Sequence, residues 1–257
     1  MNIQKKNRTA IVWISILLLG IAGGWGVLNR LSRLSPSASE TARLKEIAPP
    51  RMALIPAGEF WAGTDEEDAD EDAKPKRKVF LPSYYMDKYE VTNREYQLFD
   101  PKHPFAKGDE ELPVSAVTYD EAFAYAKWAG KRLPTNDEWE KAARGVDGRK
   151  YPWGNDWSAS KVAKRRRTNP KDKAPETDST LKSKACHVGP SRLQPGGSVP
   201  ESVSPFGCYD MAGNAWEWVQ GYFNDDSTKR ILRGGAVGYG ERACRTYIRS
   251  VEGAGDT

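Results

Sequence analysis

The feature that most constrains the fold is the motif Gly-Cys-Tyr-Asp-Met-Ala-Gly-Asn-Ala-Trp-Glu-Trp-Val at residues 207–219. Trp216 and Trp218 lie two positions apart, so in an extended strand both indoles point to one side and the carboxylate of Glu217 points to the other. The Gly-Asn pair just ahead of them is a turn signal. The motif therefore predicts a tight turn that leads into a buried strand carrying one charged side chain.

Two interpretations of this turn stay open at the level of the sequence. Asp210, Gly213 and Asn214 bring polar groups and flexible backbone into a short bend, and a hard cation prefers carboxylate and main-chain carbonyl oxygens. The alternative is a turn that only feeds a core strand. The residues alone do not decide between a cation site and a structural turn.

Three further motifs occur along the chain: Leu-Pro-Thr-Asn-Asp-Glu-Trp at 133–139, Tyr-Pro-Trp-Gly-Asn at 151–155 and Leu-Arg-Gly-Gly at 232–235. Together with 207–219, and in this order, they resemble the formylglycine-generating, or sulfatase-modifying-factor, family. The resemblance runs from about residue 52 to the end. It implies an α+β, loop-rich fold related to C-type lectins. The family includes oxidases, a sulfoxide synthase of ergothioneine synthesis and members with no shown chemistry.

The composition narrows the classes of function. The net charge is only +4, with 39 basic and 35 acidic residues among 257, which does not indicate nucleic acid as a partner. The two histidines, His103 and His187, are too few for a multi-histidine iron or zinc site. Three cysteines do not make a disulfide scaffold. We expect one domain spanning residues 51–257.

The N-terminal region predicts a membrane anchor. Residues 10–28 carry no charge, and as a helix they would span roughly 28 Å, close to the thickness of a bilayer core. The basic residues around this run favour a cytoplasmic tail at 1–9, with the domain on the periplasmic or extracellular face. Residues 29–50 have the composition of a linker. A cleavable signal peptide, with small residues at 36–39, is the alternative.

Helix starts are marked by three capping boxes, in each of which a threonine precedes a glutamate by three residues: Thr92 and Glu95, Thr118 and Glu121, Thr135 and Glu138. Residues 79–89 predict a strand. The acidic run at 65–72 predicts a solvated loop in preference to a cation site, since like charges without intervening glycine repel each other. The basic run at 161–167 predicts a loop within a long, irregular connection.

In the resembled oxidases, two cysteines near the C-terminus hold copper(I), and a sulfatase cysteine is converted to formylglycine. An ungapped count from the Gly-Gly pair places the family's serine on Ala236, its first cysteine on Tyr239, its arginine on Gly240 and its second cysteine on Cys244. Only Cys244 is kept as a candidate catalytic residue. Aligning the later arginines instead moves the second cysteine to Glu241.

The thiol of Cys244 has other interpretations. A second copper ligand would have to be Cys186 or Cys208, brought close by the fold. Alternatively, Cys244 is a small buried residue, or half of a disulfide with one of those two cysteines. The family's closing Gly-Phe-Arg strand does not occur before Thr257.

The resemblance also implies a structural calcium site. Carried over by position, its ligands are Asp210, the carbonyls of Gly213 and Ala215, and Glu217. All four oxygens are hard donors suited to calcium. Copper(I) is expected only if the protein is an oxidase.

Two functions follow from these residues. The first is an anchored binding or accessory module with a degraded oxidase centre, whose partner is a protein or a glycan. The second is an active formylglycine-generating oxidase whose partner is a sulfatase. The losses at Ala236, Tyr239 and Gly240 favour the first.

Overall fold

The computed structural model describes residues 51–162 and 193–253, together with four isolated positions before residue 51. Three antiparallel sheets share this region. Strand β1 (Met52–Ile55) pairs with β4 (Tyr84–Asp87), and β2 (Gly58–Ala62) pairs with β3 (Arg77–Leu81). The third sheet has the order β5 (Glu217–Phe223), β6 (Asp226–Arg233), β7 (Ser250–Gly253).

Three α-helices lie among these sheets: α3 (Asn93–Gln97), α4 (Tyr119–Trp128) and α5 (Asn136–Arg144). Four short 3-10 helices complete the described elements, at Glu71–Ala73, Ala159–Lys161, Pro200–Ser202 and Glu241–Cys244. The mixed, loop-rich architecture agrees with the predicted α+β class. The stretch 79–89, predicted as a strand, is extended at 79–81 and 84–87 but is not one continuous strand. Its residues belong to β3 and β4 in different sheets, because Pro82, which lacks an amide hydrogen, interrupts the run.

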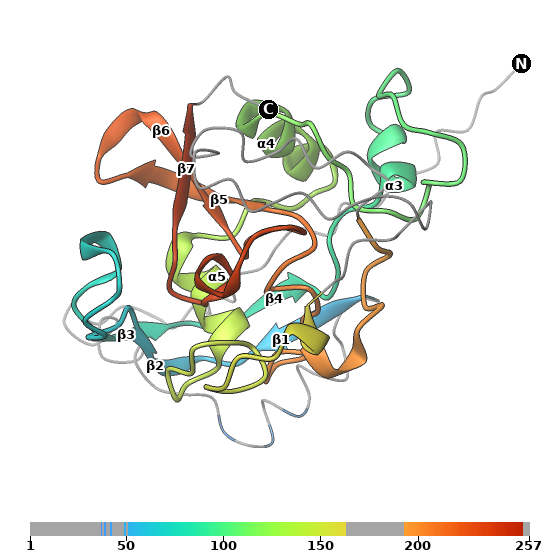
Figure 1. Ribbon diagram of the computed structural model, residues 1–257. Helices are drawn as coiled ribbons and strands as arrows, with labels where there is room; N and C mark the ends of the chain where they lie inside the picture. The colour runs from blue at the N-terminus through green and yellow to red at the C-terminus, as the bar shows by residue number, and fades with distance from the viewer. Residues whose placement is uncertain are drawn as a thin grey trace, which may run out of the picture.

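Helix α5 is the centre of the fold. Figure 1 shows it between the β1–β4 and β2–β3 sheets on one side and the β5–β6–β7 sheet on the other. Its Trp139, Ala142 and Ala143 are fully buried and pack with Ile55 of β1 and Val219 of β5. One helix face therefore joins two sheets that are far apart in the sequence.

All three predicted capping boxes are confirmed. In each, the threonine hydroxyl accepts a hydrogen bond from the N3 amide while the glutamate accepts one from the threonine amide. This satisfies two donors that the first helical turn would otherwise leave free. The signal was readable because it lies within four consecutive residues.

A buried ionic network ties α5 to both ends of the domain. Glu140 is 3% exposed, and its two carboxylate oxygens contact Arg144 and Arg233 at 2.7 Å each. The same carboxylate accepts a hydrogen bond from the amide of Gly63. Arg233 also donates to the carbonyl of Ile248. Two segments are thus fixed directly to one side chain of α5, and a third is held through Arg233.

The sequence predicted that the acidic run at 65–72 is a solvated loop. Most of its side chains are exposed, but several of its acids also form ion pairs. Asp68 pairs with Arg245 at 2.7 Å, and Asp72 with Arg249 at 3.0 Å. Asp70 pairs with Arg242 as well. Repulsion among the acids is offset by arginines that come from about 170 residues further along the chain. The loop therefore docks on the segment that carries Cys244.

The predicted N-terminal elements lie outside the described residues. This applies to the anchor at 10–28, the tail at 1–9 and nearly all of the linker at 29–50, as well as to the basic run from residue 163 onward. Within the part of the chain that the structure describes, no helix is long and apolar enough to cross a membrane.

Candidate functional site

The predicted cation turn is a tightly wound loop that precedes β5. Asp210, Gly213 and Asn214 all have positive φ, at 57°, 97° and 64°. Asp and Asn are the residues besides glycine that adopt this conformation most readily. The amide of Gly213 donates to the carbonyl of Gly234, which fixes the loop against the end of β6.

Asn214 is the hub of this loop and is fully buried. Its side-chain oxygen accepts from the amide of Gln194 at 3.0 Å, and its side-chain nitrogen donates back to the Gln194 carbonyl at 3.0 Å. The same nitrogen donates to the carboxylate of Glu90 at 2.6 Å. A residue that the sequence marked only as a turn signal therefore connects three segments.

Glu90 is a site residue that the sequence analysis missed. Its carboxylate also accepts from the amide of Ala215 at 2.9 Å, across more than 120 positions of the chain. The only sequence signal was an acid in an aromatic and β-branched run ahead of the first capping box. Such an acid needs hydrogen-bond donors when it is buried.

Glu217 faces away from Trp216 and Trp218, as the alternation of a strand predicted. The carboxylate of Glu217 accepts from the indole N–H of Trp139 at 3.0 Å, while Trp216 and Trp218 both pack on a different apolar cluster. A Cβ at Gly234 would lie 3.7 Å from Oε1 of Glu217 and 3.9 Å from the carbonyl oxygen of Ala215. These two oxygens therefore face one small space, and the absent side chain at 234 keeps it open.

The carboxylates around this loop are all harder to ionise than usual. Burial, followed by the charges of Asp210 and Glu217, raises the pKa of Glu90 well above its ordinary value. Burial also raises the pKa of Asp210, and raises that of Glu217 to about 7. Asp210 is partly compensated by the amide of Gly197, which donates to it at 2.6 Å. A bound divalent cation would relieve this repulsion and favour the ionised forms.

The donor chemistry of the loop fits calcium. Asp210 and Glu217 supply carboxylates, and Gly213 and Ala215 supply carbonyls, so every donor is a hard oxygen. Among the described residues, no three histidine, cysteine, aspartate or glutamate side chains converge as a ligand set. A cation here would thus depend on the two main-chain carbonyls as well as on the two carboxylates.

Cys244 has the surroundings of a core residue. It ends the 3-10 helix Glu241–Cys244, is fully buried and packs with Tyr151, Val162 and Ala212. Burial raises the pKa of its thiol to about 12. The thiolate that copper(I) requires is disfavoured in such an apolar environment.

Cys208 does not complete a two-thiol site. It belongs to the cluster around α5, whereas Cys244 belongs to another, and both are free thiols. The disulfide between them that the sequence left open is therefore absent. Cys186 lies outside the described residues. The donors that the structure describes around Cys244 do not fit copper(I).

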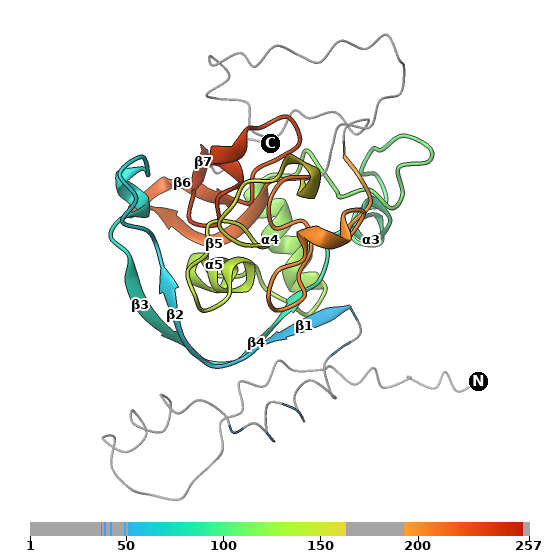
Figure 2. The same cartoon turned by 60° about the horizontal axis from the view of Figure 1, so that its bottom comes forward.

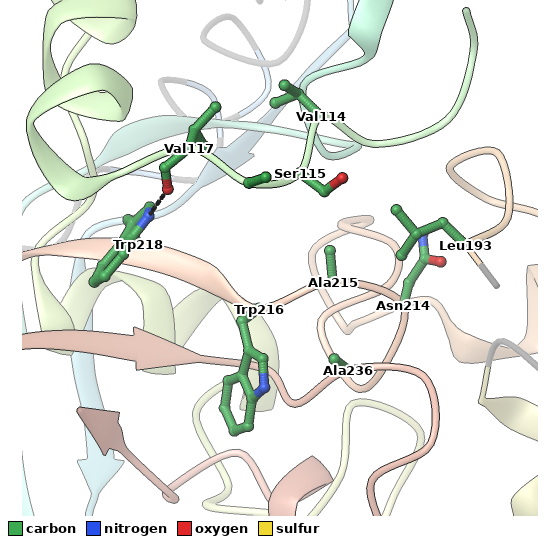
Figure 3. Close-up of a pocket in the computed structure, with 10 residues that line it drawn as sticks. Val114, Ser115, Val117, Leu193, Asn214, Ala215, Trp216, Trp218 and Ala236 are labelled. Atoms are coloured by element: carbon green, nitrogen blue, oxygen red, sulfur yellow. Dashed lines mark hydrogen bonds between the residues drawn. The ribbon is translucent and has the colours of Figure 1, made fainter. Parts of the chain in front are cut away.

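A cleft lies beside the cation turn. Figure 3 shows its walls converging from the 114–117 loop, from Asn214 to Trp218, and from Leu193 and Ala236. The indole of Trp218 donates to the carbonyl of Val117 at 3.0 Å, which joins two of the walls. The Trp216 ring stands edge-on to Tyr239 with centroids 5.4 Å apart. The Trp216 N–H has no acceptor among the described residues.

Comparison with known proteins decides the family. Residues 37–256 match the sulfatase-modifying factor enzyme 1-like domain. The chain belongs to this family. The uncharacterized protein YfmG of Bacillus subtilis is 32% identical and covers 70% of the chain, which in turn spans 43% of YfmG. The formylglycine-generating enzyme of Mus musculus is 27% identical, with 79% of the chain and 67% of that enzyme covered.

Other similar proteins include a relative named as inactive and two solved structures. The inactive Cα-formylglycine-generating enzyme 2 of Bos taurus is 27% identical, covering 71% of the chain and 75% of that protein. PvdO from Pseudomonas aeruginosa has a TM-score of 0.60 at 21% identity, over 80% of the chain and 89% of PvdO. Treponema denticola variable protein 1 has a TM-score of 0.58 at 19% identity, over 79% and 90%. The two solved structures show the fold alone.

Within this sulfatase-modifying-factor domain, the positions of the oxidase pattern have different surroundings. Ala236 lines the cleft, where the family's serine falls in the ungapped count, and Tyr239 contacts Trp216. Cys244 packs instead with the aromatic cluster of Tyr151. The structure thus keeps the cleft and the cation turn close together, while the remaining thiol is sealed in the core.

Proposed function

We propose that the protein is a membrane-anchored binding or accessory module, with its sulfatase-modifying-factor domain outside the cytoplasm and its oxidase centre degraded. The observation that carries the proposal is the state of Cys244, which is fully buried and whose pKa is raised to about 12 by burial. Tyr239 occupies the position of the other cysteine in the ungapped count. A reaction centre tolerates the loss of a ligand less well than a scaffold does.

The cleft beside the cation turn is the binding surface in this proposal. Its walls are mainly apolar. Such a surface suits a partner that brings an apolar group, such as the side chain of a peptide segment or the apolar face of a glycan. The fold's relation to C-type lectins, implied by the sequence resemblance, agrees with such a role.

Calcium is the proposed structural cofactor. Asp210, Glu217 and the carbonyls of Gly213 and Ala215 would hold it, and its charge would offset the repulsion among the buried carboxylates. In this structural role calcium takes no part in a chemical reaction. It would hold the loop that forms one wall of the cleft.

The second candidate function is an active formylglycine-generating oxidase. It is favoured by the retained Cys244 and by the similarity to the mouse enzyme. This candidate requires a second thiol beside Cys244 and a rearrangement that exposes both thiols to copper(I) and oxygen.

One experiment separates the two functions. The full chain, in detergent with calcium, is incubated with copper(I), oxygen and a peptide carrying a sulfatase-type cysteine motif, and the peptide mass is followed. The binding-module proposal predicts an unchanged cysteine. Conversion to the aldehyde that is lost in Cys244→Ser but kept in Cys208→Ser would refute it and establish the oxidase.

A further inference from the structure

The outer surface of α3 and α4 carries an exposed apolar patch. Leu98 caps the C-terminus of α3 and is 71% exposed, and Trp128 ends α4 and is 53% exposed. The ring of Phe99 lies 5.7 Å from that of Trp128, and the exposed Leu98 directly precedes Phe99 in the chain. We call Leu98, Phe99 and Trp128 the α3–α4 patch.

The α3–α4 patch is not needed to close the core beneath it. Tyr96 is 2% exposed and stacks on Tyr125 with centroids 5.3 Å apart. These two rings already fill the space between the helices. Leu98 and Trp128 extend beyond them into solvent, and an apolar surface left in this way is typical of an interaction site.

The chain enters the domain beside this patch. Arg51, the first residue of the continuous described region, forms an ion pair with Glu95 at 2.7 Å and lies over the ring of Tyr89. Glu95 is in the first turn of α3, about 5 Å along the helix axis from Leu98. The described domain therefore begins, at Arg51, beside the helix that carries Leu98.

The predicted linker is short enough for the patch to reach the bilayer. If its roughly 22 residues are flexible, their end-to-end distance is about 25 Å, and the radius of gyration of a domain of this size is about 17 Å. The tether holds the patch at a high effective concentration near the lipid, so that even a weak surface interaction is populated.

The chemistry of the patch fits the interface of a bilayer. Tryptophan, phenylalanine and leucine partition into the headgroup boundary, where an indole keeps its N–H in a polar layer. Lys102 and Lys127 are exposed and close in sequence to the patch, and so is Asp100. The lysines would face lipid phosphates, while Asp100 reduces the attraction to anionic lipid.

We propose that the α3–α4 patch docks on the lipid surface next to the anchor and so orients the domain on the membrane. The proposal rests on the anchoring stated under Proposed function. Figures 1 and 2 show α3 on the side of the molecule away from β2 and β3, so docking through α3 would turn the β2–β3 sheet away from the lipid.

The test uses the full chain in vesicles of phosphatidylcholine and phosphatidylglycerol. A fluorophore is attached at Leu98→Cys or, as a control, at Val146→Cys, both in a Cys186→Ser background. Val146 is a matched site because it is apolar, 55% exposed and in the loop that packs through Gly148 against Trp61 of β2. Quenching by aqueous iodide and by a lipid-borne quencher is measured at each site.

Docking predicts at least threefold weaker iodide quenching at position 98 than at 146, together with stronger lipid-borne quenching at 98. Equal iodide quenching at the two sites, in a chain that floats with the vesicles, overturns docking while leaving the anchor intact. A chain that does not float overturns the anchor, and the docking proposal with it.

Discussion

The buried network around Glu140 allows the sharpest prediction of stability. Although burial opposes ionisation, the guanidiniums of Arg233 and Arg144 lower the pKa of Glu140 below its usual value. The carboxylate is therefore charged in the folded protein, and it is the negative partner for both arginines. Glu140→Gln keeps the size of the side chain but leaves two buried guanidiniums without their counter-charge.

Removing one partner of a buried ion pair costs about 3–5 kcal/mol. For a domain of about 200 residues, each kcal/mol lowers the Tm by about 2–4 °C. We therefore expect the Tm of Glu140→Gln to fall by at least about 6 °C. The assay is thermal unfolding of the full chain in detergent, followed by far-ultraviolet circular dichroism.

The matched control is Glu71→Gln. Glu71 also pairs with a basic side chain, Lys74, at 3.0 Å, but its side chain is 91% exposed. Exposed pairs contribute about 0–1 kcal/mol, so at about 2–4 °C per kcal/mol its Tm should stay within about 4 °C of the wild type. If Glu140→Gln shifted the Tm as little as this control does, the stabilising role assigned to the buried network would be refuted.

Three further predictions concern the cation turn, a helix cap and the thiols. Because the pKa of Glu217 in the fold is about 7, above its ordinary 4.5, calcium-free protein should lose stability as the pH rises from about 4.5 through 7; in Tm measurements, calcium should reverse this loss in the wild type and Glu217→Gln should show a smaller loss without calcium, and a wild-type loss insensitive to calcium would contradict the assignment. Thr118→Ala should lower the free energy of unfolding by about 1 kcal/mol in urea titrations, whereas an unchanged midpoint would count against the cap. In a Cys186→Ser background, Cys208 and Cys244 should react with a thiol reagent only after denaturation, since both are buried; rapid native labelling would show that the core around them opens.

The parts of the fold that were predictable depend on neighbouring residues. A capping box needs only a threonine and a glutamate three positions apart, so Thr92, Thr118 and Thr135 could be identified directly. The opposite facing of Trp218 and Glu217 likewise follows from the alternation of a strand. In each case the physical cause lies within a few residues of the signal.

The parts that were missed depend on contacts between distant residues. Glu90 reaches Asn214 across 124 positions, and Asp68 reaches Arg245 across 177. Charge repulsion within the acidic run suggested a solvated loop, because the compensating arginines could not be located without the fold. The role of Cys244 as ligand, disulfide partner or core residue could not be predicted for the same reason, since its burial depends on Tyr151 and Ala212.

The most direct test of the central claim is a copper(I) titration of the full chain against a competing chelator, with Cys244→Ser in parallel. The claim is that Cys244 is a core thiol without a second thiolate beside it. We predict that the wild type and the variant compete equally weakly for copper(I), with no stoichiometric site. Tight binding of one copper(I) per chain that is lost in Cys244→Ser would contradict the claim and would support the alternative function as an oxidase.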